Sequence, residues 1–157
     1  MAAGSFTLYS NAVTAAAQGS FNFGSDNYNV ILLTTAYTPS PNSDTLYSDI
    51  SSSEVAAGGG YTVGGQTMTG VTWVRNTGTS TFSAQSVAWP GSTISARYAA
   101  IVRRGGVTLA PGDRLLGFVD LSGGGSVSTT AATFQINWNN SSTPSSAAPI
   151  FNVSHSP

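Results

Sequence analysis

Short runs in which apolar and polar residues alternate, most of them bounded by glycine or proline, restrict the fold of this chain more than any other feature. The longest run covers residues 94–103, and similar alternation occurs at residues 66–75, 81–89 and 133–139. A period of two places successive side chains on opposite faces of a β-strand. The pattern therefore predicts an all-β chain built from short strands.

Two further runs are almost continuously apolar, as in strands that are covered on both faces. Residues 28–35 contain four consecutive branched aliphatic side chains and are expected at the centre of a sheet. Residues 115–121 form the second apolar run. Residues 149–153 are a candidate last strand at a sheet edge.

Glycine and proline mark the reversals between these strands. Five glycines bracket Tyr61 within residues 58–65, a density explained by tight turns or close backbone approaches. Glycines at residues 105–106 and 123–125 predict two further breaks. Pro90 followed by glycine predicts a turn directly after the preceding strand.

Two short helical segments are expected. Residues 11–18 are rich in alanine, with Asn11 placed as the N-cap and Gly19 placed to end the helix. Ser51 and Glu54 have the spacing of a capping box, which predicts one helical turn at this point.

Seven or eight short strands at this spacing predict one domain, an antiparallel β-sandwich or jelly-roll-like fold with a short N-terminal helix. A chain of 157 residues is long enough for one hydrophobic core. Residues 1–20 are expected to form an arm and the helix, and residues 21–138 the sandwich core. Residues 139–157 are expected to form a loop rich in Ser, Pro and Ala, then a tail with the candidate edge strand.

Charged residues make up only 7% of the chain, which contains no lysine, no cysteine and a single histidine, His155. The lack of thiols excludes disulfides and thiol-ligated metal sites, and a lone histidine near the chain end argues against a catalytic triad. Five arginines and a net charge of −1 predict no nucleic-acid partner. Near-neutral copies repel one another weakly, which favours self-association. The first residues predict neither a signal peptide nor a membrane anchor.

The acidic residues offer candidate pairs for glycoside cleavage, among Asp44, Asp49 and Glu54 or between Asp113 and Asp120. Asn42 together with Asp44 and Asp49 offers oxygens to a calcium ion, although the spacing matches no EF-hand. Loop carboxylates more often cap turns and helices. The sequence therefore predicts no catalytic residue, no cofactor and no metal site.

Arg97 and the tryptophans are the remaining side chains of functional interest. A charged residue in the middle of a strand is expected to have a partner, which for Arg97 would be Asp49, Glu54 or a neighbouring subunit. Tryptophans stack on sugars in some proteins, but those within alternating strands are expected in the core. The chain has three: Trp73, Trp89 and Trp138.

Five short segments follow one another along the chain: LLTTAYTP at residues 32–39, YSDI at 47–50, GYTVGGQTMTG at 60–70, VAWP at 87–90 and ARYA at 96–99. In this order they resemble a family of small virion proteins of tailed bacteriophages. The family pattern often has more acidic residues between the proline loop and the tryptophan, so the resemblance implies no metal site here. The residues that carry it are Gly60, Tyr61, Gly64, Gly65, Trp89, Arg97 and Tyr98.

The resemblance implies a β-sandwich accessory protein of the virion, above all a decoration or cement protein on the capsid exterior. Its partners would be the major capsid protein and further copies of itself, often as a trimer, after synthesis in the host cytoplasm. Residues near both chain ends are candidate interface arms that become ordered on assembly: Phe6, Leu8, Tyr9, Ile150 and Phe151.

Two other functions remain as alternatives. One is a head-fibre or tail-tip module that recognises host-surface glycan, with Tyr61, Trp73 or Trp89 stacking on sugar rings. The other, more remote, is a small polysaccharide-cleaving enzyme that would use the paired carboxylates.

Overall fold

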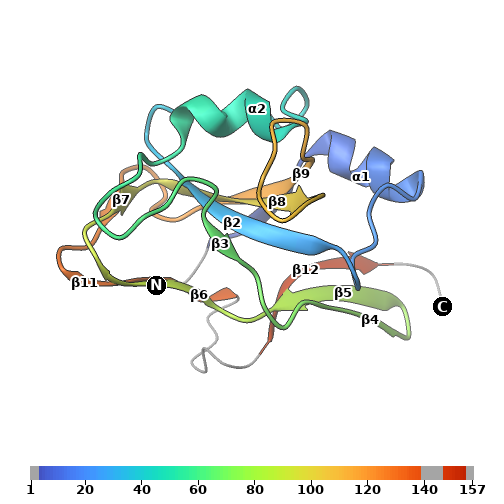
Figure 1. Ribbon diagram of the computed structural model, residues 1–157. Helices are drawn as coiled ribbons and strands as arrows, with labels where there is room; N and C mark the ends of the chain where they lie inside the picture. Colours follow the sequence, from blue (N-terminus) through green and yellow to red (C-terminus); the bar gives the residue numbers. More distant parts are fainter. Residues whose placement is uncertain (1–3, 139–146, 155–157) are drawn as a thin grey trace.

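A computed structural model describes residues 4–138 and 147–154, and it consists mainly of antiparallel strands with few helical residues (Figure 1). This confirms the predicted all-β class. The strands are arranged as two facing layers, as expected for a sandwich. His155 lies outside the described residues.

The larger layer is a five-stranded antiparallel sheet. Its strands lie in the order β1 (Phe6–Leu8), β9 (Leu115–Asp120), β8 (Tyr98–Arg104), β2 (Asn27–Leu33) and β3 (Gln66–Thr67). After its first residue, β2 is buried along its whole length, as its apolar sequence predicted. The middle position belongs to β8, so β2 is the inner strand beside the centre and not the centre itself.

The remaining strands form three smaller antiparallel sheets. One has the order β12–β5–β4 and lies beneath β2 and β8 in Figure 1, while β11 pairs with β6 and β10 pairs with β7. The position of β12 at a sheet edge confirms the predicted last strand. Their bounds are β4 (Thr72–Asn76), β5 (Thr79–Ala84), β6 (Val87–Ser92), β7 (Ser95–Ala96), β10 (Val127–Ser128), β11 (Ala132–Ile136) and β12 (Ala148–Ser154).

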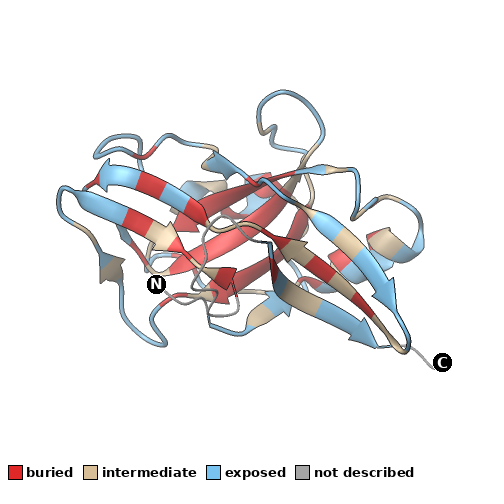
Figure 2. Ribbon diagram, turned by 90° about the horizontal axis from the view of Figure 1, so that it is seen from below, coloured by how far each residue is buried: buried red, intermediate tan, exposed pale blue. Residues whose placement is uncertain are grey.

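One hydrophobic core joins the two layers, and its residues line the facing strands (Figure 2). Tyr28 on β2 contacts Phe82 on β5 edge to face, with ring centroids 5.3 Å apart. Trp89 and Trp138 are almost completely buried, which confirms that these two tryptophans serve the core. Stability therefore comes from aromatic and aliphatic burial between the sheets.

The first helix, α1 (Ser10–Ala17), confirms the helix predicted at residues 11–18 to within one residue at each end. Gly19 has a φ of +75° and follows the end of the helix, as predicted. The predicted cap is wrong: Tyr9 occupies the N-cap position without a side-chain hydrogen bond, and Asn11 lies inside the first turn. The helix start is set by the strand that precedes it, because β1 ends only two residues earlier.

The second helical segment begins before the predicted position. A helical turn, α2 (Tyr47–Ile50), is followed by a 3-10 turn, η1 (Ser51–Ser53), so the predicted capping box at Ser51 and Glu54 is wrong. The capping residue is Asp49, whose carboxylate accepts hydrogen bonds of 2.8 Å from two preceding backbone N–H groups. The Glu54 carboxylate points instead into the core.

Three predicted strands are each divided in two. Gly70, with a φ of +60°, interrupts the run at residues 66–75, and residues 85–86 interrupt the next run. The longest run is broken at Arg97, between β7 and β8. Pro90 makes no turn but lies in a bulge of β6, where Pro90 and Gly91 together oppose one residue of β11 and a proline costs no ladder hydrogen bond. An alternating pattern does not reveal where a chain leaves one sheet for another.

Candidate functional site

All six carboxylates of the chain hold parts of its own structure. Each accepts hydrogen bonds from backbone N–H groups, from tyrosine hydroxyls or from an arginine: Asp26, Asp44, Asp49, Glu54, Asp113 and Asp120. Asp44, for example, accepts from the hydroxyl of Tyr37 at 2.7 Å and from the N–H of Ser40 at 3.1 Å. In the ranges that the structure describes, no three acidic, histidine or cysteine side chains are placed to hold a metal ion.

Glu54 forms the most buried of these contacts. Its Oε1 accepts hydrogen bonds from the Tyr61 hydroxyl at 2.6 Å and from the Gly64 N–H at 2.7 Å, and its Oε2 accepts one from the Tyr47 hydroxyl. The Tyr61 hydroxyl in turn accepts from the N–H of Leu32 at 3.0 Å. Burial, reinforced by the carboxylate, raises the pKa of both tyrosines well above its ordinary value. This cluster fastens the glycine-rich reversal to β2 and α2.

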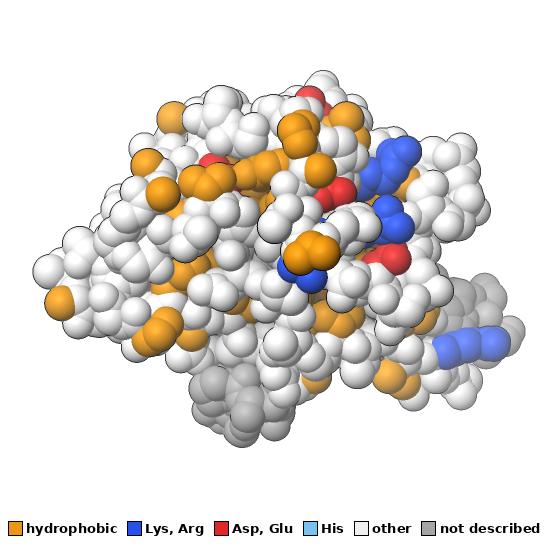
Figure 3. Space-filling view, viewed as in Figure 1, with side chains coloured by type: hydrophobic (Ala, Val, Ile, Leu, Met, Phe, Trp, Pro, Cys, Tyr) orange, Lys and Arg blue, Asp and Glu red, His pale blue; other side chains and the backbone are white. Residues whose placement is uncertain are grey.

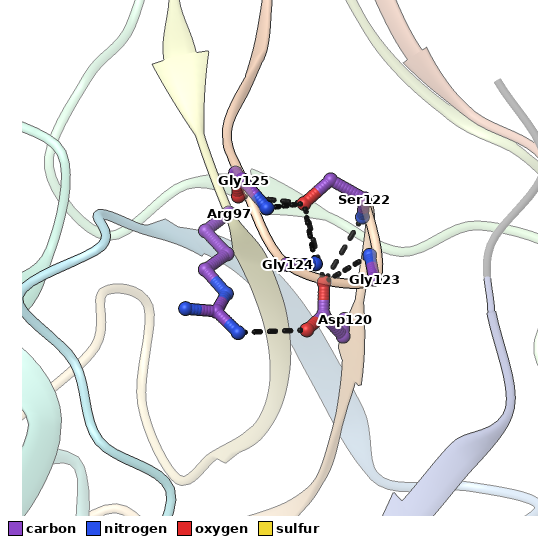
Figure 4. A network of polar contacts seen from close by, with 6 residues as sticks. All are labelled: Arg97, Asp120, Ser122, Gly123, Gly124 and Gly125. Carbon is purple, nitrogen blue, oxygen red and sulfur yellow. Dashed lines mark hydrogen bonds and ion pairs between the residues drawn. The ribbon is translucent and has the colours of Figure 1, made fainter.

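Arg97 pairs with Asp120, so the expectation that its partner is Asp49 or Glu54 is wrong (Figure 4). Nη2 of Arg97 lies 3.4 Å from Oδ2 of Asp120, and the guanidinium lies 4.8 Å from the ring centroid of Tyr98. Oδ1 of Asp120 accepts two backbone N–H groups of the next turn, at 3.0 and 2.8 Å. Burial acts to raise the pKa of Asp120, but these hydrogen bonds and the arginine outweigh it and lower that pKa. The pair orders the turn after β9.

The residues that carry the bacteriophage resemblance support the fold. Tyr61 and Trp89 are both buried, with ring centroids 6.0 Å apart, so neither is exposed to stack on a sugar. Gly65 has a φ of +65°, and a Cβ at this position would lie 1.9 Å from the carbonyl oxygen of Val30 on β2. Gly60 has a φ of +87°, and a Cβ at this position would make a tight contact of 3.1 Å with the Cβ of Ser92 on β6. The glycines allow close approach of neighbouring strands, and the two aromatic rings fill the core, so these residues are explained by packing.

The candidate interface arms are edge strands of the fold. Phe6 and Leu8 belong to β1, which pairs with β9, and Tyr9 is completely buried. Ile150 and Phe151 belong to β12, which pairs with β5. The rings of Phe6 and Phe151 stack, with centroids 5.7 Å apart and planes inclined by 9°. The two edge strands thus contact each other, and the expectation of free arms is wrong for these residues.

An apolar groove opens between α1 and the sheet that contains β12 and β4. It has a volume of about 240 Å³ and is lined only by apolar side chains. Val13 and Val153 are 55% and 43% exposed, so solvent reaches the groove from outside. The helix contributes Ala12, Val13 and Ala16 to the lining, and the opposite side contributes Trp73, Phe151 and Val153. None of the candidate catalytic carboxylates lines it.

The chain matches no family model, no curated protein and no solved structure. Its resemblance to virion proteins of tailed bacteriophages therefore rests on the five sequence segments alone. Among the described residues, no helix combines the length and the apolar character needed to cross a membrane.

The groove is suited to binding uncharged groups. A polar or charged group placed against its apolar lining would lose hydrogen bonds to water without gaining new ones. On the face shown in Figure 3, charged side chains are few and lie among uncharged atoms. Sequence patterns missed the groove because its lining comes from segments that lie far apart in the sequence, from Leu8 through Trp73 and Leu116 to Val153. The one local signal is Val13, a β-branched apolar residue on the exposed face of a helix.

Proposed function

We propose that this protein is a structural protein of a tailed-bacteriophage virion that binds the exterior of the capsid and stabilises it without catalysing a reaction. Its partners are the major capsid protein and further copies of itself, arranged as a trimer. It is made in the host cytoplasm and acts on the assembled shell as a decoration or cement protein. The proposal starts from the five ordered segments that resemble such proteins.

The observation that carries the proposal is that the carboxylates of the protein hold its own structure together. Each of the six carboxylates is engaged in a hydrogen bond or ion pair that orders the protein itself. General acid–base chemistry needs such a group to face a substrate in a cavity. The apolar groove between α1 and the sheet of β12 and β4 offers apolar side chains instead. A molecule with these properties acts by fitting against another surface.

Stabilisation of a capsid follows from mass action. A protein that binds the assembled shell, and not the separated subunits, lowers the free energy of the shell in proportion to the number of bound copies. A small neutral protein suits this role, because many copies can lie close together without strong charge repulsion.

The test is to add the purified protein to phage heads that lack decoration and to heads that already carry it. We expect saturable co-sedimentation with the undecorated heads and a higher disruption temperature after binding. Decorated heads provide the control, because their sites are filled. Heads that retain no protein, or that disrupt at an unchanged temperature with protein bound, would contradict the proposal.

A glycan-binding module at a head fibre or tail tip is the second candidate, and Trp73 is the observation that favours it. Trp73 is only partly buried and lines the groove, unlike the other two stacking candidates. Retention of the purified protein on intact host cells, abolished in Trp73→Ala, would favour this function. No retention on cells, together with binding to heads, would eliminate it.

A further inference from the structure

Val107 is the most exposed large hydrophobic side chain of the described residues, at 90% exposure. It lies in the loop of residues 105–114, which connects β8 to β9. The stretch from residue 105 to 112 contains no charged residue. An isolated apolar side chain on a surface needs no explanation by itself. The case for Val107 as a binding residue therefore also depends on how well the surrounding loop is held in place.

Hydrogen bonds within the loop that carries Val107 support its conformation. The carboxylate of Asp113 accepts hydrogen bonds from the N–H of Gly105 at 3.0 Å and from the N–H of Ala110 at 2.8 Å. The N–H of Asp113 donates back to the carbonyl of Ala110 at 2.9 Å, and Leu109 packs against the core. A partner that binds Val107 therefore pays little conformational entropy to order the loop.

The apolar groove has the volume and the chemistry to receive such a side chain. A closed apolar cavity of about 150 Å³ is large enough to bind benzene, and the groove has about 240 Å³. It therefore has room for a branched aliphatic side chain with part of its backbone. Because its lining is almost entirely apolar and carries no charge, it favours an uncharged segment over a charged one.

We propose that the groove of one copy receives the Val107 loop of a second copy. The assignment rests on the self-association within the proposed function and names the two surfaces that make it. The lining of the groove and residues 105–112 of the loop carry no charge, and the net charge of −1 puts little repulsion between copies. Because loop and groove are different surfaces, the contact is either reciprocal within a pair or repeated head to tail around a closed ring.

Aspartate substitutions test the contact with matched controls. We expect Val107→Asp and Val13→Asp each to shift the protein from oligomer to monomer in sedimentation velocity over a dilution series. Val63→Asp and Val74→Asp are the controls, since these valines are 53% and 49% exposed but do not line the groove. All four variants should keep the circular dichroism spectrum of the unmodified protein, because the substituted side chains are exposed.

Disulfide crosslinking tests the same contact directly, because the chain contains no cysteine of its own. A mixture of Val13→Cys and Val107→Cys proteins should form the mixed disulfide on mild oxidation, since the bond needs Cα atoms within about 7 Å. A mixture of Val63→Cys and Val107→Cys proteins should form far less.

Three results would overturn the contact: a monomeric unmodified protein, an oligomer that survives Val13→Asp or Val107→Asp, or equal crosslinking in both mixtures. These measurements use no capsid. A failure of the head-binding experiment would therefore contradict the proposed function, while the contact between the groove and the Val107 loop would still be tested independently.

Discussion

At the scale of single residues, Glu54 satisfies two tyrosine hydroxyls and one backbone N–H inside the core. Glu54→Ala removes the acceptor and leaves all three donors unpaired. Each buried unpaired group costs about 1–3 kcal/mol, so we expect a loss of at least about 3 kcal/mol in the free energy of unfolding. Urea denaturation followed by tryptophan fluorescence measures it.

Glu54→Gln is the matched control for that prediction. The amide oxygen can still accept from Tyr61 and Gly64, and the amide NH₂ can donate to the hydroxyl oxygen of Tyr47. We expect this variant to lose at most about 1 kcal/mol. Equal losses in the two variants would show that the negative charge, and not the satisfied hydrogen bonds, is what the core requires.

The buried tyrosines predict the response of the protein to alkali. Burial, as the main cause, raises the pKa of five phenols above its ordinary value of 10.0: Tyr9, Tyr28, Tyr37, Tyr47 and Tyr61. Above that value the unfolded chain loses phenolic protons that the folded chain keeps. The stabilisation is therefore complete below pH 10.0 and is lost progressively as the pH rises toward the higher folded-state pKa values.

The composition makes this prediction simple to measure. The chain has no lysine and no cysteine, so tyrosine is the main side chain that titrates between about pH 9 and 12. We expect tyrosinate absorbance and the loss of circular dichroism to rise together in an alkaline titration. Tyrosinate signal from most of the tyrosines in a still folded protein would contradict it.

At the scale of elements, two adjacent glycines in the reversal after η1 distinguish the cost of backbone strain from the cost of a steric clash. Gly64 and Gly65 have φ values of +92° and +65°, so alanine is strained at either position. A Cβ on Gly64 would meet open space, whereas a Cβ on Gly65 would lie 1.9 Å from the carbonyl oxygen of Val30. We expect Gly64→Ala to cost about 1–2 kcal/mol and Gly65→Ala to cost clearly more, by displacing β3 from β2.

Urea denaturation of the two glycine variants gives the difference, and Gly112→Ala is the neutral control because its Cβ would meet nothing within 4 Å at an ordinary φ. If Gly64→Ala and Gly65→Ala lower the free energy of unfolding by similar amounts, β3 can move away from β2 without a loss of stability.

Local sequence patterns predicted the elements whose structure is decided locally. The alanine-rich segment became α1, and the two apolar runs became β2 and β9. The break at Arg97 could not be predicted, because distant groups make it: its N–H donates to Leu33 at 2.8 Å, and its guanidinium contacts Asp120. The helix-capping motif at Glu54 failed for the same reason, since Tyr61 and Gly64 lie beyond the reach of any helix pattern.

At the scale of the whole molecule, the two layers share one core, and we expect them to unfold together. Tyr28 of the larger sheet packs on Phe82 of the three-stranded sheet, so neither layer keeps its buried face when the other opens. Urea transitions followed by tryptophan fluorescence and by far-ultraviolet circular dichroism should coincide. Two separated midpoints would show that one sheet is stable alone.

The candidate site belongs to this scale as well. Sequence reasoning predicted no catalytic residue, an expectation that depends on composition, and it identified neither the groove nor the loop that carries Val107 as surfaces. The groove exists only when α1, β4 and β12 come together. Fold-defining residues such as Gly65 and Trp89 were recognisable because they belong to conspicuous motifs, and they proved to lie away from this surface.

The position of β12 affects how the protein is made. This strand borders β5 and places Phe151 against Phe82, with ring centroids 5.1 Å apart, yet the ribosome adds it long after β4 and β5. A nascent chain therefore carries β4 and β5 with one apolar side uncovered until β12 has been synthesised. The three-stranded sheet is complete only once β12 has left the ribosome, and a chain that stalls before β12 presents exposed aromatic side chains to chaperones and proteases of the cell.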